Sequence, residues 1–161
     1  MSVILYQLEM RAKSRKYFAH SFLGEGMRKH YLMLNVIAPL LAGASIYYLF
    51  FPKTIFVEFI DEFLGCSYHI PIDPENIFVR GFRYYLPDFL WAYAFTGLVI
   101  CLTGYDKRYI AAAFLFEVLM ELIQLFPSIR GTFDVCDIIT EMVASVLAII
   151  LSIWRTSNEK V

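Results

Sequence analysis

Residues 117–141, EVLMELIQLFPSIRGTFDVCDIITE, decide the fold, because they place polar residues of two helices on either side of one turn. Glu117, Glu121 and Gln124 stand four and three residues apart in an apolar run, so they share one face of a helix. Beyond the turn, acids recur at the same two spacings at the head of a second apolar run. These acids are Asp134, Asp137 and Glu141. The sequence therefore predicts two helices whose acidic faces flank the turn.

The composition predicts a membrane protein. The chain has 161 residues, of which 59% are hydrophobic and 18% charged, with a mean hydropathy of +0.58. A soluble domain is about half apolar. Four apolar runs have roughly the 20 residues that cross a bilayer, at residues 31–51, 86–104, 109–126 and 135–154. We expect an all-α polytopic membrane protein, a four-transmembrane-helix bundle, with residues 1–30 as an uncleaved basic leader and 155–161 as a tail.

The basic residues predict the orientation of the bundle. Ten of the 14 lysines and arginines fall in the leader, the second connection and the tail, namely Arg11, Lys13, Arg15, Lys16, Arg28, Lys29, Lys107, Arg108, Arg155 and Lys160. The other four are Lys53, Arg80, Arg83 and Arg130. The positive-inside rule places both termini in the cytoplasm and the acidic turn outside the cell membrane. The basic leader meets phosphates in lipid headgroups, which favours a membrane partner over nucleic acid.

The connection after the first span predicts a short amphipathic helix. In TIFVEFIDEFLG, residues 54–65, Thr54 is placed as a helix cap and Gly65 as a stop. Its apolar face suits the outer membrane surface, and the alternative is a lid over the acidic turn. The three cysteines have no CxxC spacing, so no zinc motif is indicated. Pairing of Cys66 with Cys136 stays open, and Cys101 is expected to fill space in the core.

Prolines and glycines mark further features of the spans. Pro39 predicts a kink in the first span. Pro87 is expected in the first turn of the second span, where capping alone accounts for Asp88. The alternative places Asp88 beside the acids of the turn. Gly97 permits a close helix contact and Gly104 an end to the helix.

Two linked motifs resemble a known family. The pattern Glu121-x-x-Gln124, followed by GTFDVCDI at residues 131–138, closely resembles the motif of VanZ-like membrane proteins. LPDFLWAYAF, residues 86–95, resembles the opening of the preceding span in one branch of that family. The resemblance covers residues 80–154 and departs at Glu141, where the family commonly has an aromatic residue or an amide followed by glycine. It implies a cell-envelope membrane protein connected with susceptibility to glycopeptides such as teicoplanin, and it implies no reaction.

Three hypotheses explain the polar residues. The candidate site consists of Asp88, Glu117, Glu121, Gln124, Arg130, Thr132, Asp134, Asp137 and Glu141. In the first hypothesis these groups lock helices together: Asp134 and Asp137 cap the fourth helix, and Arg130 pairs with one of them. Glu121 and Gln124 then bond to Thr132 or to backbone groups of the turn.

The second hypothesis is binding of a membrane lipid or a lipid-linked cell-wall precursor. Arg130 meets a phosphate, and Mg²⁺ or Ca²⁺ held by carboxylates bridges to it. The candidate metal ligands are Asp88, Glu121, Asp134 and Asp137. The third hypothesis is an enzyme that uses the same carboxylates for acid/base or metal-assisted chemistry on a lipid-linked substrate. The sequence leaves the choice between binding and catalysis open.

Overall fold

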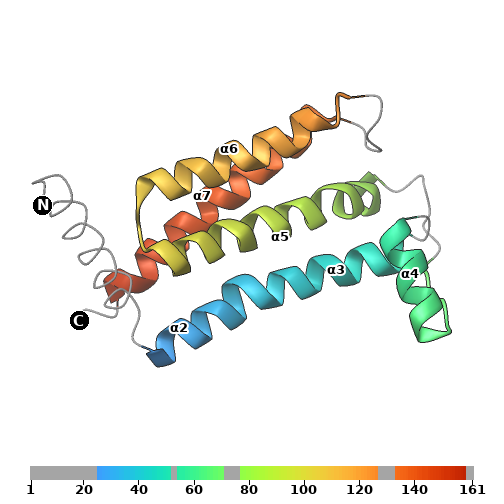
Figure 1. Ribbon diagram of the computed structural model, residues 1–161, viewed down its shortest axis with the longest axis horizontal. Helices are drawn as coiled ribbons and strands as arrows, with labels where there is room; N and C mark the ends of the chain where they lie inside the picture. Colours follow the sequence, from blue (N-terminus) through green and yellow to red (C-terminus); the bar gives the residue numbers. More distant parts are fainter. Residues whose placement is uncertain (1–24, 52–53, 71–76, 127–132, 159–161) are drawn as a thin grey trace, which may run out of the picture.

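The computed structural model describes residues 25–51, 54–70, 77–126 and 133–158, which contain helices and no strand. The elements are α2 (Glu25–Leu32), the π-helical turn η1 (Met33–Ile37), α3 (Ala38–Phe50), α4 (Ile55–Leu64), α5 (Ile77–Thr103), α6 (Lys107–Ile123) and α7 (Val135–Asn158). The first three form one continuous helix, which lies along one side of α5, while α6 and α7 lie along the other (Figure 1). The all-α prediction is confirmed, and α5 is the central helix.

Three helices in the described part of the chain are long and apolar enough to cross a membrane. They are Lys29–Phe50, Gly81–Thr103 and Val135–Arg155. These correspond to the spans expected at 31–51, 86–104 and 135–154. The helix expected at 109–126 is present as α6, but it has 17 residues, fewer than the roughly 20 that cross a bilayer. Three membrane-length helices and a shorter α6 therefore make up the bundle.

Pro87 lies inside α5 and not in its first turn, so that prediction is wrong. The helix begins at Ile77, because the polar and aromatic residues that precede the apolar run continue the same regular helix. Asp88 is consequently too far from the helix start to act as its cap, and capping no longer accounts for this carboxylate. A proline removes one backbone donor, and α5 continues through that loss.

The predicted irregularity at Pro39 takes the form of a π-helical turn. Pro39 has no N–H to offer the carbonyl of Asn35 four residues earlier, and the helix widens over Met33–Ile37. The freed carbonyl faces Gly97 of α5, where an added Cβ would lie 3.1 Å from the Asn35 oxygen. Tyr93 also donates from its hydroxyl to Asn35 Oδ1 at 2.6 Å. The first helix therefore packs on α5 through Asn35, as expected from the small residue at Gly97.

The helix α4 has the predicted bounds but a different cap. Gly65 ends it with a φ of 66°, which favours glycine. Thr54 stands at the N-cap position, yet its hydroxyl donates back to the Phe51 carbonyl at 3.2 Å and does not cap α4. Phe59 and Phe63 of the apolar face are 63% and 77% exposed. This helix thus presents an apolar face to its surroundings.

The connections on both sides of the bundle are held by side chains. His69 Nε2 lies 2.8 Å from Asp61 Oδ2 of α4, and His69 Nδ1 lies 3.0 Å from the Tyr48 carbonyl of α3. At the other end, Gly104 ends α5 with a φ of 68°, and Asp106 Oδ1 accepts from the Arg108 N–H at the start of α6. The tight turn makes α5 and α6 antiparallel neighbours (Figure 1).

All three cysteines are free in the structure. Cys101 is buried beside Tyr31, as a small core residue, which matches its predicted role. Cys66 and Cys136 are both exposed.

The contact at Gly97 gives a test of helix packing. We expect Gly97→Leu to lower the melting temperature in detergent, because overpacking against a backbone carbonyl typically costs about 1–3 kcal/mol. The matched control is Gly81→Leu on the same helix, since a Cβ at Gly81 meets no atom within 4 Å. The control is expected to keep or raise stability, because leucine is the better helix former by about 1 kcal/mol. Equal melting temperatures for the two variants would contradict this contact.

Candidate functional site

A polar cavity lies at the end of the bundle where α6 ends and α7 begins. Its volume is about 540 Å³, within the roughly 300–1,000 Å³ of small-molecule sites. It is lined by Tyr47, Phe51, Tyr84, Tyr85, Asp88, Glu121, Gln124, Asp134 and Asp137. These residues come from four helices or their adjoining ends. We call this cavity the acidic pocket.

The acidic pocket gathers five of the nine residues that the sequence singled out. They are Asp88, Glu121, Gln124, Asp134 and Asp137. Arg130 and Thr132 lie outside the described residues, and Glu117 and Glu141 are buried deeper in the bundle. The sequence analysis missed the aromatic wall of the pocket. A signal existed in Tyr84 and Tyr85, which precede Asp88 by about one helical turn and so share its side of α5.

The polar side chains of the pocket differ in their hydrogen-bond partners. Asp134 Oδ1 accepts from the Cys136 N–H at 2.9 Å and so caps α7. Gln124 donates from Nε2 to Glu121 Oε1 at 2.9 Å. Glu121 is 6% exposed, and its Oε2 has no hydrogen-bond partner among the described residues. A buried acceptor without a donor is unfavourable, so the Oε2 of Glu121 has lost its water contacts without gaining a hydrogen bond from the described residues.

Glu117 belongs to a separate network that joins three helices. Ser145 Oγ of α7 lies 3.0 and 2.9 Å from the two carboxylate oxygens of Glu117 on α6. Thr96 Oγ1 of α5 lies 2.8 Å from Ser145 Oγ. All three side chains are buried. We call this network the helix lock. It holds helices together, which is the role that the first hypothesis gave to the polar groups around the turn. Thr96 and Ser145 were not among the predicted residues.

Glu141 lies between the helix lock and the acidic pocket along α7. It is 5% exposed, and in the described part of the chain its Oε2 has no hydrogen-bond partner. Its position four residues before Ser145 and four after Asp137 places the three on one face of α7. Ionisable groups inside a membrane are expensive and commonly mark functional positions.

The carboxylates of the acidic pocket are not arranged as a metal site. Within the described ranges, no three His, Cys, Asp or Glu side chains converge closely enough to hold a metal ion. The predicted ligands Asp88, Glu121, Asp134 and Asp137 line one cavity but are spread around its wall. Mg²⁺ or Ca²⁺ at this place would need most of its oxygen ligands from water or from a bound molecule.

A basic side chain stands next to the acidic pocket. The guanidinium carbon of Arg83 lies 4.5 Å from the ring centre of Phe51 and 5.4 Å from that of Tyr84. Both rings line the pocket. Arg83 Nε is buried and lacks a hydrogen-bond partner within the residues described. In the described part of the chain, the site therefore combines a cluster of acids with Arg83 beside its aromatic wall.

No family model, curated protein or solved structure matches this chain.

The helix lock predicts an asymmetric effect of two similar substitutions. We expect Ser145→Ala to destabilise the protein by about 1–3 kcal/mol, because it removes the donor to a buried carboxylate. Ser45→Ala is the matched control, since Ser45 is exposed and donates only to the Leu41 carbonyl of its own helix. It should change stability by less than about 0.5 kcal/mol. The check is unfolding in detergent, and equal effects of the two changes would exclude the lock.

Proposed function

We propose that this chain is an integral membrane protein that binds the polar head of an envelope amphiphile in the acidic pocket. The observation that carries the proposal is that Glu121 lines a cavity of about 540 Å³ while its buried Oε2 has no hydrogen-bond partner among the described residues. The cavity lies at the ends of helices long enough to cross a membrane. A bound group that donates hydrogen bonds satisfies this acceptor.

The chemistry of the pocket favours an ammonium group. Four carboxylates line it, so a cation is attracted and a bare anion is repelled. Apart from Gln124, the other lining residues are three tyrosines and a phenylalanine, and aromatic faces attract ammonium groups. An ammonium also supplies the donors that Glu121 lacks. It is favoured over a directly bound divalent ion because the carboxylates do not converge.

Arg83 extends the proposal to a zwitterionic head. A phosphate is a strong acceptor for a guanidinium, and the Nε of Arg83 is without a partner among the described residues. An ammonium among the acids and a phosphate at Arg83 together match the two charged parts of the site. A membrane lipid or a lipid-linked cell-wall precursor that carries both groups belongs to this class.

Binding without turnover is favoured over catalysis. Among the described residues that line the acidic pocket there is no serine, cysteine or histidine to act as a nucleophile or a histidine base. The carboxylates alone supply the residue types for acid/base chemistry, but no observation selects that role. An enzyme using them on a lipid-linked substrate is the less supported alternative.

The membrane arrangement is part of the same proposal. We take α6 as a fourth, short span, with both termini in the cytoplasm of a multi-pass cell-membrane protein. The acidic pocket then faces outward, and α4 lies on the outer surface with its exposed phenylalanines in lipid. The motif at residues 121–138 supports membership of the VanZ-like family and, with it, an influence on glycopeptide susceptibility.

The proposal is tested with the soluble head of phosphatidylethanolamine, glycerophosphoethanolamine. We expect it to raise the melting temperature of the purified wild-type protein, because a ligand bound by the folded state stabilises that state by mass action. The shift should be lost in Asp137→Asn, which removes one pocket charge. Asp137 is preferable to Asp134, whose side chain caps α7. Glu58→Gln, an exposed carboxylate change on α4, is the control and should keep the shift.

Two results would contradict the proposal. One is no shift in the wild type, and the other is an equal shift in wild type and Asp137→Asn. A chelator added to the same assay distinguishes direct binding from binding through a divalent cation. For direct binding we expect the melting-temperature shift to be unchanged.

A further inference from the structure

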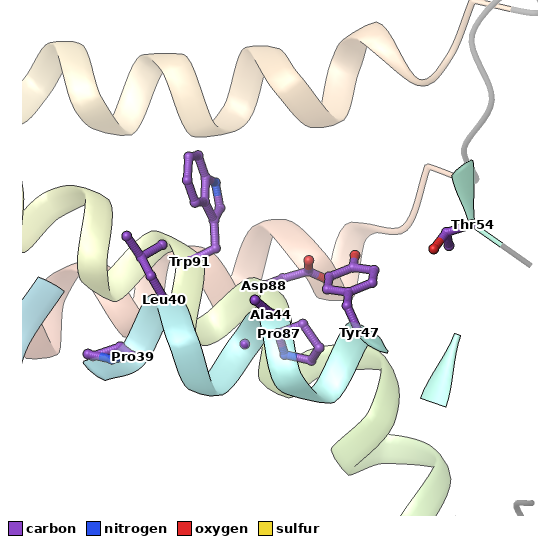
Figure 2. Close-up of a pocket in the computed structure, with 9 residues that line it drawn as sticks. Pro39, Leu40, Ala44, Tyr47, Thr54, Pro87, Asp88 and Trp91 are labelled. Carbon is purple, nitrogen blue, oxygen red and sulfur yellow. The ribbon is translucent and has the colours of Figure 1, made fainter. Parts of the chain in front are cut away.

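A second hollow lies on the other side of Asp88, between α3 and α5. Its volume is about 580 Å³, and most of its wall is apolar. The apolar lining consists of Pro39, Leu40, Gly43, Ala44, Pro87 and Trp91. Figure 2 shows these helices side by side, with Tyr47 and Asp88 toward one end of the hollow and Pro39 and Leu40 toward the other. We call this hollow the apolar groove.

Small and ring-shaped residues create the apolar groove. At Gly43 an added Cβ would lie 3.7 Å from Leu90 Cβ and 3.8 Å from the Pro87 carbonyl, so the two helices touch closely there. Ala44, on the same helix, is exposed and too short to fill the space beside this contact. Leu40 and Trp91 are 36% and 45% exposed, so the groove opens on the outside of the helix pair.

The apolar groove and the acidic pocket share two wall residues. Tyr47 and Asp88 line both, so the polar end of the groove adjoins the pocket. From Tyr47 back to Pro39 the groove follows α3 for about 12 Å, at a rise of about 1.5 Å per residue. This stretch lies inside the membrane-length helices Lys29–Phe50 and Gly81–Thr103. The two hollows thus share a wall at Tyr47 and Asp88, and the apolar groove runs from there along two membrane-length helices.

We infer that the apolar groove holds a hydrocarbon chain of the same amphiphile whose ammonium head lies in the acidic pocket. The inference rests on the proposed function and adds how the ligand is held and where it enters. The head meets the carboxylates, the chain passes between Tyr47 and Asp88, and its methylenes cover the ring of Trp91. A ligand of this kind reaches its site sideways from the bilayer.

The size and polarity of the groove favour a chain over a helix of a second copy. A helix with its side chains is about 10–12 Å across, so two turns of it need more volume than the groove offers. A helix would reach the acidic pocket only through a long side chain such as lysine or arginine. A single hydrocarbon chain is thin, and it is the material that surrounds a membrane-spanning helix pair.

Trp91 provides a direct probe, because the chain has two tryptophans. The experiment uses Trp154→Phe, which leaves Trp91 as the single tryptophan, in detergent micelles with lipids brominated in mid-chain. Bromine quenches tryptophan on contact. Brominated phosphatidylethanolamine is compared with brominated phosphatidylglycerol, since both carry a phosphate and the same chains but the first alone carries an ammonium. We expect stronger quenching of Trp91 by phosphatidylethanolamine.

Two sets of controls locate the quenching. In Trp91→Phe the remaining Trp154, which is 65% exposed, reports the surrounding lipid and should be quenched equally by both lipids. Ala44→Phe fills the apolar groove and should abolish the difference at Trp91. Ala42→Phe makes the same change at an exposed position of α3 that does not line the groove, and it should keep the difference. Melting temperatures of both variants establish that they are folded.

The outcomes separate this inference from the proposed function. In one outcome, the two lipids quench Trp91 equally while glycerophosphoethanolamine still raises the melting temperature in an Asp137-dependent way. This result overturns the chain site in the groove and leaves the head site in place. Equal quenching without any such shift overturns both. A difference in Trp91 quenching between the two lipids that survives in Ala44→Phe also overturns the proposed chain site. So does a change of oligomeric state in Ala44→Phe with quenching unaffected, because the groove would then be a contact between copies of the protein.

Discussion

The hydrogen bonds of Glu117 with Ser145 and Thr96 are the interaction on which the core of this bundle depends. In a membrane, helices gain little from burying apolar surface against one another, so small residues and polar contacts hold them in register. Because this network joins α5, α6 and α7 at one depth, it also fixes the residues one turn nearer the acidic pocket. Glu121 follows Glu117 by one turn of α6, and Glu141 precedes Ser145 by one turn of α7. The helix lock therefore positions the acids that approach the acidic pocket.

Two prolines shape the opposite side of α5. Each removes a backbone donor from a membrane-length helix, and the bundle accommodates the two in different ways. The carbonyl freed by Pro39 packs against Gly97, which closes that part of the contact between α3 and α5. Near Pro87 the helices touch at Gly43, and the small side chain of Ala44 leaves the apolar groove beside the contact. The residues that allow close packing thus also leave a hollow, because they have no side chains to fill it.

Much of the acidic pocket could be predicted from spacing alone. Polar residues three and four apart share a helix face, and a short turn makes two such faces meet, which brings Glu121 and Gln124 to Asp134 and Asp137. Asp88 could be placed beside these residues because successive spans run in opposite directions, so the start of the second span lies at the same end as the turn after the third. The start of α5 was predicted wrongly because hydropathy marks the part of a helix that suits lipid, whereas the helix itself continues to Ile77. Thr96 and Ser145 were missed because a small hydroxyl residue in an apolar run looks like a packing residue, and only the fold supplies its partner.

The separation of charge at the site is the reason why the proposed ligand is a zwitterion and not a simple cation. The guanidinium of Arg83 stacks on Phe51 and Tyr84 of the pocket wall, and no ion pair joins it to a pocket acid among the described residues. If the two charges were paired, a ligand would have to break that pair before it bound. Held apart by aromatic rings, each charge keeps an unpartnered buried atom, Nε on Arg83 and Oε2 on Glu121. This is why the proposed ligand carries both an ammonium and a phosphate, since an amine or a phosphate alone offers a partner for one of the two atoms and leaves the other desolvated.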